Sequence, residues 1–113
     1  MLRMQSAAAI EKNKIFQALA DPSRRAILES LTRGEAAVKD LTARFDISQP
    51  AVSQHLAALK DAGLVNRRRE GRCVYYRVEP RGMKPLINWI AHYRTFWTDH
   101  VGRLEKLLET MGE

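Results

Sequence analysis

The spacing of apolar residues changes at Leu64, and this change most constrains the fold of the 113-residue chain. Before Leu64, apolar residues recur every three or four positions, which is typical of amphipathic helices. After it, Val74, Tyr76 and Val78 occupy alternate positions, which is typical of a strand. From about Met83 the helical spacing returns. The sequence therefore predicts a mainly α fold with a small β-hairpin.

We expect five helices and one two-stranded hairpin within a single domain that covers residues 1–113. The helices are expected at about residues 10–19, 22–33, 38–45, 48–62 and 83–111. Asp21 and Ser48 are good N-caps for the second and fourth helices. Pro22 and Pro50 follow them in the first helical turn, where proline is tolerated because no N–H is needed there.

The chain has a net charge of +6, which creates a positive potential on so small a body. Nucleic acid is the first candidate partner for such a surface, and an anionic membrane surface is the second. The single cysteine cannot form an internal disulfide, and no apolar run approaches the roughly 18 residues of a membrane span. Residues 1–9 lack the apolar core of a signal peptide and are expected to form a frayed tail. We therefore expect a cytoplasmic protein without a membrane partner.

The expected helices over residues 38–45 and 48–62 are separated by a tight turn around Asp46-Ile47-Ser48. This spacing matches a helix-turn-helix, in which the first helix braces the second for entry into the major groove. An ordinary pair of core helices would have the same spacing. The second helix favours DNA binding, because short polar side chains remain on its outer face once Val52, Leu56 and Leu59 are turned inward.

The outer face of this second helix carries the expected base-reading residues. Glutamine can pair bidentately with adenine, and serine can bind a base or a phosphate. His55 lies nearer the buried flank, where a packed or phosphate-contacting histidine is favoured over a catalytic or ligand-binding one. The expected DNA contacts in this helix are Ser48, Gln49, Pro50, Ser53, Gln54, His55 and Lys60.

A cluster of arginines surrounds the Glu70-Gly71 turn of the expected hairpin. Residues 64–82 contain six arginines and two glutamates and so contribute +4 to the net charge. Arginines on a protruding hairpin can reach phosphates or a narrow minor groove. A charge run is more often a solvated face, but its position directly after a helix-turn-helix favours DNA contact. The expected contacts are Arg67, Arg68, Arg69 and Arg72.

Three segments follow one another along most of the chain: ALADPSRRAILESL (residues 18–31), DISQPAVSQHLAALKDAGLV (46–65) and REGRCVYYRV (69–78). This succession resembles the ArsR family of bacterial winged-helix repressors. The resemblance implies a helix-turn-helix over about residues 38–62, a wing over about 64–79 and dimerisation helices over about 10–19 and 83–111. It also implies a homodimer that binds double-stranded DNA and represses its own operon until an inducer releases it. One departure is Asp46, where relatives often have glycine in the turn.

Many members of that family bind a metal through a Cys-x-Cys pair on the third helix. Here the two thiolate positions are Ala37 and Lys39, neither of which can ligate a soft cation. A second family site on the last helix uses Asp-x-His and His-x-x-Glu, a pattern that His92, Asp99 and His100 do not follow. We therefore expect no metal site and no cofactor.

The last helix carries an apolar stripe at spacings of three and four, which is typical of a coiled-coil-like seam. So long a stripe cannot be covered by so small a body, which implies a partner helix from a second copy. Trp89 and Phe96 widen the stripe into an aromatic surface that could line a pocket for an inducer of unknown identity, but dimer core is favoured. The expected interface residues are Ile90, Tyr93, Trp97, Val101, Leu104 and Leu108.

Two other classes of function compete with DNA binding as explanations of the sequence. An enzyme is disfavoured, because no Ser-His-Asp or Cys-His motif and no Gly-rich phosphate loop stands out. A winged helix that binds only proteins would explain the seam, but would leave the arginine cluster and the short polar helix face without a purpose. Cys73 lies between Arg72 and Tyr75 and could act as a redox switch, although a space-filling strand cysteine is favoured.

Overall fold

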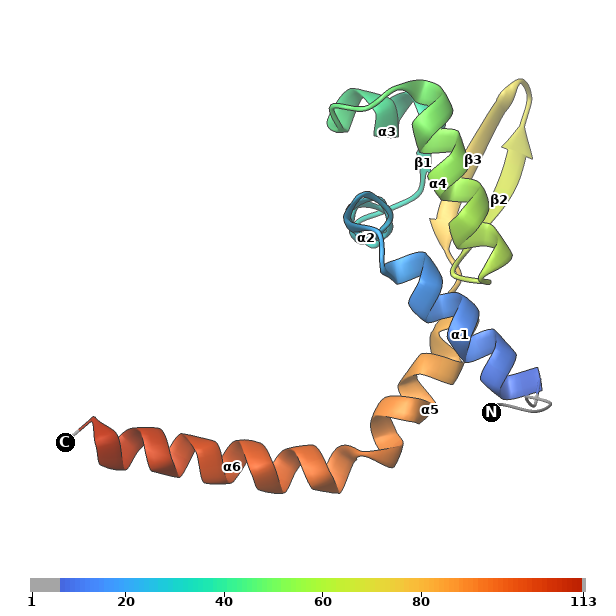
Figure 1. The fold of residues 1–113 in the computed structure, drawn as a ribbon. Coiled ribbons are helices and arrows are strands. Elements are labelled where there is room, and N and C mark those ends of the chain that lie inside the picture. Colours follow the sequence, from blue (N-terminus) through green and yellow to red (C-terminus); the bar gives the residue numbers. More distant parts are fainter. Residues whose placement is uncertain (1–6, 113) are drawn as a thin grey trace.

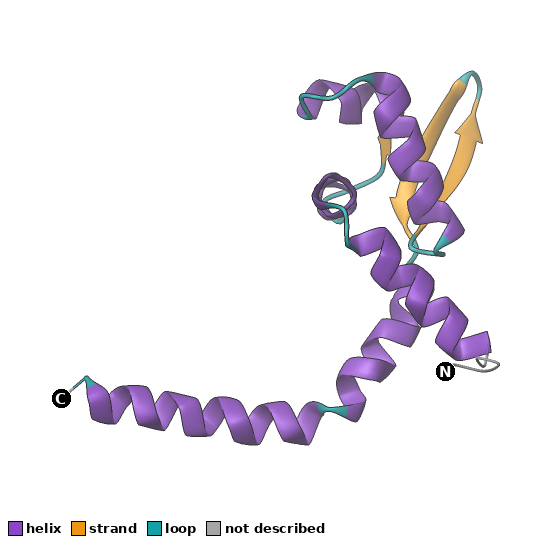
Figure 2. Ribbon diagram, in the orientation of Figure 1, coloured by secondary structure: helices purple, strands orange, loops and turns teal. Residues whose placement is uncertain are grey.

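The computed structural model describes residues 7–112, and it describes their side chains from Ala9 onward except that of Trp97. Helices make up most of the described chain, and three strands form one small sheet (Figures 1 and 2). The α-helices are α1 (Ala7–Leu19), α2 (Pro22–Leu31), α3 (Val38–Arg44), α4 (Gln49–Asp61), α5 (Lys84–His92) and α6 (Arg94–Met111). The strands are β1 (Ala36–Ala37), β2 (Val65–Glu70) and β3 (Cys73–Val78), and a 3₁₀ helix η1 (Pro80–Met83) precedes α5. The mainly α fold with a small hairpin is confirmed, but the expected counts of five helices and two strands are wrong.

β2 and β3 form the expected antiparallel hairpin, with Val65 opposite Val78 and Glu70 opposite Cys73. Gly71 turns the chain between them with a φ of 60°, a left-handed conformation that glycine adopts at no steric cost. β1 pairs with the other side of β3, which gives the sheet order β1-β3-β2. The sequence analysis missed β1 because a strand of two residues has no alternating pattern.

Side chains at the start of α2 and just before it cap both α1 and α2. The Asp21 carboxylate accepts a hydrogen bond from the backbone N–H of Arg24 at 3.1 Å, which confirms Asp21 as the N-cap of α2. Arg24 Nε donates to the Ala18 carbonyl at 2.6 Å, and Arg25 Nη1 donates to the Leu19 carbonyl at 2.6 Å. These carbonyls belong to the last turn of α1 and have no partner within that helix. The run Asp-Pro-Ser-Arg-Arg therefore fixes the corner between the first two helices.

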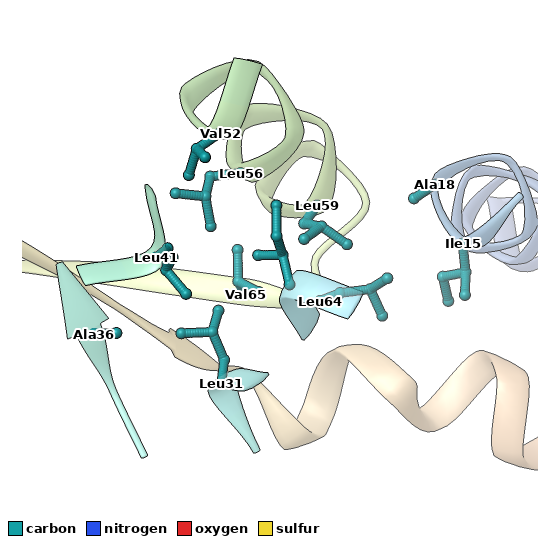
Figure 3. Packing of buried hydrophobic residues seen from close by; sticks show 11 residues of the cluster. Ile15, Ala18, Leu31, Ala36, Leu41, Val52, Leu56, Leu59, Leu64 and Val65 are labelled. Atoms are coloured by element: carbon teal, nitrogen blue, oxygen red, sulfur yellow. The ribbon is translucent and has the colours of Figure 1, made fainter. Parts of the chain in front are cut away.

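One hydrophobic core joins the N-terminal helices to the sheet (Figure 3). The inward face predicted for α4 is confirmed, because Val52, Leu56 and Leu59 are fully buried. Leu41 of α3 and Val65 of β2 belong to the same cluster. The other members are Ile15, Ala18, Ile27, Leu31, Ala36 and Leu64. Because this core contacts α2, α3, α4 and β2 together, it fixes the orientation of α4 relative to the hairpin.

Both ends of the described chain differ from the expected boundaries. The first helix begins at Ala7 rather than Ile10, because the run of alanines has a high helix propensity; residues 1–6 of the expected tail lie outside the described chain. The expected helix over residues 83–111 is wrong, since the chain breaks at Tyr93 into α5 and α6. Tyr93 has φ −101° and ψ 9°. The spacing of apolar residues did not reveal the break, because they still recur every three or four positions when one residue between them is not helical.

α5 packs against α1, whereas α6 extends away from the rest of the molecule (Figure 1). The Phe16 ring of α1 meets the Trp89 ring of α5 edge to face, with centroids 5.2 Å apart. The Trp89 ring also meets the Tyr93 ring, with centroids 5.3 Å apart, so this aromatic cluster reaches the residue where the chain turns into α6. Within residues 7–112, no helix is both long and apolar enough to cross a membrane.

Candidate nucleic-acid interface

α3 and α4 form a rigid pair whose connection is held by the core. Phe45 and Ile47, on either side of the exposed Asp46, pack against the buried cluster. Within the described residues, no residue other than glycine has a positive φ, so Asp46 causes no left-handed strain in the turn. Ser48 caps α4 as expected, because its hydroxyl oxygen accepts the Ala51 backbone N–H at 3.2 Å.

The face of α4 opposite the core is exposed and polar. Lys60 lies near the C-terminal end of this face, whereas its N-terminal part carries amides, hydroxyls and a proline. Such short side chains let a helix backbone approach base edges closely. The exposed residues of this face are Gln49, Pro50, Ser53, Gln54, Ala57 and Lys60. The structure thus places the predicted base-reading residues together on one solvent-facing surface, with Ser48 exposed at its start.

His55 lies apart from this surface, on the flank of α4. Its side chain is half-buried, as the sequence predicted, and it lies close enough to Asp21 to affect that carboxylate. The pKa of Asp21 is lowered chiefly by the backbone N–H of Arg24, with smaller contributions from the Ser23 N–H and from His55. His55 therefore faces the start of α2, and its expected DNA contact stays a prediction.

The two faces of the hairpin have different roles. Successive side chains of a strand point to opposite faces, so Arg67 and Arg69 share the face of the buried Val65. That face turns toward α4, because Val65 belongs to the same core cluster as the α4 stripe. Arg67 and Arg69 are exposed, and so is Arg72 in the turn. Three of the four predicted wing contacts therefore lie in solvent beyond the core.

Arg68 points to the other face and is engaged by the protein itself. Its Nε donates to Glu35 Oε2 at 2.9 Å and its Nη2 to Glu35 Oε1, while its Nη1 donates to Glu70 Oε2 at 2.9 Å. The guanidinium lies over the Tyr75 ring, 4.9 Å from its centroid. The hydrogen bonds from Arg68 are the largest cause that lowers the pKa of Glu35. In turn, the hydrogen bonds to Glu35 and Glu70 raise the pKa of Arg68.

Sequence reasoning missed Glu35 as a partner of the wing. Glu35 lies 33 residues before Arg68, and no periodicity or motif connects the two positions. The connection comes from the strand order, because β1 directly follows Glu35 and pairs with β3. Since β1 itself was not predicted, the approach of Glu35 to the hairpin could not be predicted either.

The positions of the family's metal ligands hold other side chains. Ala37 is buried in β1, and Lys39 is exposed on α3. His92 and His100 lie on different helices. The His92 ring meets the Tyr93 ring, with centroids 4.9 Å apart. The Nδ1 atom of His100 lies 2.8 Å from the Phe96 carbonyl oxygen. Among the described residues, no group of three or more His, Cys, Asp or Glu side chains is arranged to hold a metal ion.

The predicted dimer residues are exposed on α5 and α6. Large apolar side chains along α6 are about half exposed, with Val101 at 47%, Leu104 at 54% and Leu108 at 57%. Ile90 of α5 is 50% exposed, and Tyr93 at the break is 39% exposed. The side chain of Trp97 lies outside the described residues. Although the break divides the expected seam, both parts carry an uncovered apolar surface.

Cys73 is half-buried at the start of β3, on the face that carries Tyr75. The pKa of Tyr75 is raised chiefly by its electrostatic interaction with Cys73 and by a hydrogen bond to that residue. Cys73 is the chain's one cysteine, so no second thiol of the same chain can form a disulfide with it.

Comparison with known proteins gives concordant similarities. Residues 21–67 match the family model described as "Bacterial regulatory protein, arsR family". The chain is 36% identical to the transcriptional repressor SdpR of Bacillus subtilis over 81 residues, which cover 72% of this chain and 90% of the relative. It is 39% identical to the HTH-type transcriptional regulator Rv2034 of Mycobacterium tuberculosis, over 89% of this chain and 92% of the relative. The crystal structure of an ArsR family transcriptional regulator, RHA00566, is similar with a TM-score of 0.71 at 34% identity, covering 87% of this chain and 97% of the other.

Proposed function

The chain belongs to the arsR family of bacterial regulatory proteins, and on that premise we propose that it is a repressor that binds a symmetric DNA operator as a homodimer. Members of this family regulate transcription and are not enzymes. Repression is supported by the names of relatives, which include a biofilm growth-associated repressor of Agrobacterium fabrum and the arsenical resistance operon repressor of Escherichia coli. A protein that binds operator DNA works in the cytoplasm, and we propose that location.

The exposed polar face of α4 is the observation that carries the proposal. Gln49, Ser53 and Gln54 project from a helix whose opposite side is fully buried, so the helix cannot rotate to adapt to a site. A rigid helix with short hydrogen-bonding side chains is suited to reading base edges in the major groove. We propose that these three residues provide sequence specificity, with Ser48, Pro50 and Lys60 close to the DNA at the borders of the same face.

The wing arginines supply affinity without sequence information. Arg67, Arg69 and Arg72 are exposed on a hairpin that projects beside α4 (Figure 1). Each phosphate neutralised by such a side chain releases condensed counterions, so binding weakens as salt rises. A winged helix that binds only proteins does not account for this concentration of positive charge next to a polar recognition face.

A second copy of the chain is the proposed partner of α5 and α6. Monomeric proteins rarely expose a continuous apolar surface of this extent, and the surface here continues along all of α6. α1 lies directly against α5, so we include it in the dimerisation region. A two-fold dimer presents two copies of α4, which implies half-sites about one helical turn apart or a multiple of it.

The releasing signal is not a metal bound by the thiolate pair on the third helix, because Ala37 and Lys39 occupy those positions. An arsenic resistance transcriptional regulator of Pseudomonas putida is 43% identical over 67 residues, so relatives of this chain include a protein whose name refers to arsenic. We propose that this chain shares their DNA-binding module and responds to a different signal.

DNA footprinting on the region upstream of the protein's own gene tests the proposal. We expect protection of two symmetric half-sites, which unlabelled copies of the same DNA compete away and random DNA of equal length does not. Protection without sequence preference, or none at all, would contradict the assignment of α4 as the reader.

A further inference from the structure

The wing has few attachments to the rest of the protein. Its β2 strand is buried at Val65, whereas the following residues toward the turn are exposed or half-buried. On the other side, β3 pairs with β1 over two positions, Ala36 opposite Tyr76 and Ala37 opposite Tyr75. This two-residue strand pairs with the middle of β3, and the hairpin residues nearer the turn, including Arg69 and Arg72, lie beyond that pairing. Another interaction is needed to set the angle of the outer half.

Arg68 provides that interaction, at the middle of β2. It lies opposite Tyr75 in the hairpin, and Tyr75 lies opposite Ala37 of β1. Glu35, two positions before Ala37, therefore projects from the edge of the sheet toward the Arg68 side chain. The guanidinium presents two N–H groups in parallel to the Glu35 carboxylate and a third to Glu70, with its face over Tyr75. Such two-pronged pairing fixes orientation as well as distance.

We propose that Glu35 and Arg68 form an ionic brace that sets the angle of the wing relative to α4, so that Arg68 is a positioning residue and not a phosphate contact. This inference rests on the proposed function, because the angle matters only if the wing binds DNA beside α4. The brace connects Glu35, in the loop before β1, to Arg68 at the middle of β2 and through Arg68 to Glu70 beside the turn. It keeps Arg67 and Arg69 on the α4 side.

The brace and a simple electrostatic role predict opposite effects of one substitution. Glu35→Gln removes a negative charge from a surface that faces a polyanion, so electrostatics alone predicts tighter DNA binding. The brace predicts weaker binding by about fivefold, because an amide cannot accept two charge-assisted bonds and the wing loses its angle. Asp46→Asn is the matched control: it removes a negative charge from the exposed turn before α4, and Asp46 is in no ion pair of the described residues.

The experiment measures operator affinity against salt for five variants of the 113-residue chain, one of them Arg68→Ala. We expect weaker binding with an unchanged salt slope for Glu35→Gln, and tighter or equal binding for Asp46→Asn. The charge exchange Glu35→Arg/Arg68→Glu should restore part of the affinity that Glu35→Gln loses, since it rebuilds the pair with reversed polarity but places the new carboxylate beside Glu70. Arg69→Ala, an exposed wing arginine, should reduce the slope.

Two results would overturn the brace. One is an Arg68→Ala variant that loses as much salt slope as Arg69→Ala while the charge exchange restores nothing, which would make Arg68 a phosphate contact. The other is unchanged hydrogen exchange of the β2 and β3 backbone amides in DNA-free Glu35→Gln, where the brace predicts faster exchange. If the wild type bound no DNA, the proposed function would fail, and the exchange measurement would still decide whether the brace exists.

Discussion

Gly82 lies directly against the backbone of Gly63, and this close approach provides a sharp test of how the wing is joined to the C-terminal helices. A Cβ at this position would lie 1.6 Å from the Gly63 carbonyl oxygen and 2.5 Å from its carbon. Real Cβ atoms stay at least 3.0 Å from such neighbours, so Gly82→Ala requires the two segments to separate by about 1.4 Å. The contacted atoms are backbone, so no side chain can rotate away.

The backbone around this contact is fixed by hydrogen bonds. The Gly63 N–H donates to the Lys60 carbonyl at 2.9 Å, and the Leu64 N–H donates to the Leu59 carbonyl at 2.9 Å. Glu79, just before η1, donates its N–H to the Leu64 carbonyl at 2.9 Å. Overpacking costs about 1–3 kcal/mol where side chains can adjust, so we expect at least about 3 kcal/mol here. For a domain of this size that lowers the unfolding midpoint by roughly 12 °C, at about 4 °C per kcal/mol.

Thermal unfolding followed by circular dichroism measures this effect, at one protein concentration because a dimer's midpoint depends on concentration. Gly102→Ala in α6 is the control, since a Cβ there would meet nothing within 4 Å and alanine is the better helix former. Its midpoint should stay the same or rise. A Gly82→Ala variant that melts within about 2 °C of the wild type would refute the close approach, since it corresponds to only about 0.5 kcal/mol.

Three further predictions follow from the charges and the exposed surfaces. Val101→Glu/Leu104→Glu should abolish the dimer in light scattering, because both side chains lie on the uncovered face of α6; a monomeric wild type at micromolar concentration would contradict the dimer. Zinc, cadmium or arsenite at one equivalent should leave DNA-binding anisotropy unchanged, and release by any of them would reveal a metal site outside the family positions. Because Arg68 lowers the pKa of Glu35 from its ordinary value of 4.5, the brace stabilises the folded chain above that pH and is lost as the pH falls through the lowered pKa. The wild type should therefore lose stability more steeply than Glu35→Gln as acid unfolding is followed below pH 4.5.

The sequence predicted those parts of the fold whose signals are local. Asp21 and Ser48 were recognisable as N-caps because the capping side chain lies within a few residues of the N–H groups it satisfies. The buried stripe of α4 followed from the helical period of 3.6 residues, and the β2–β3 hairpin from the strand period of two residues. Both periods can be recognised from residues that are close together in the sequence. The polar face of α4 followed from the same period, once the buried side was assigned.

The features that the sequence did not predict depend on contacts between distant segments. β1 exists because the edge of β3 is available to it, and two alanines carry no signal of that pairing. Arg68 was grouped with the other wing arginines because nothing near it in the sequence identifies Glu35 as its partner. The break at Tyr93 likewise coincides with contacts of Trp89 to Phe16 and Tyr93, and the spacing of apolar residues does not reveal such contacts.

The division of roles between α4 and the wing is the central claim, and one set of affinities tests it directly. Operator and random-sequence affinities are measured against salt for the wild type, Gln54→Ala and Arg69→Ala. Gln54 should read a base, at about 1–3 kcal/mol of discrimination per copy, so its loss from both copies of the dimer should reduce the ratio of operator to random affinity at least about 30-fold. Arg69 should bind a phosphate, so its loss should weaken both DNAs alike and lower the salt slope by about 0.9 per copy. If Arg69→Ala reduced the ratio while Gln54→Ala left it unchanged, the wing would be the reader and this account of α4 would be wrong.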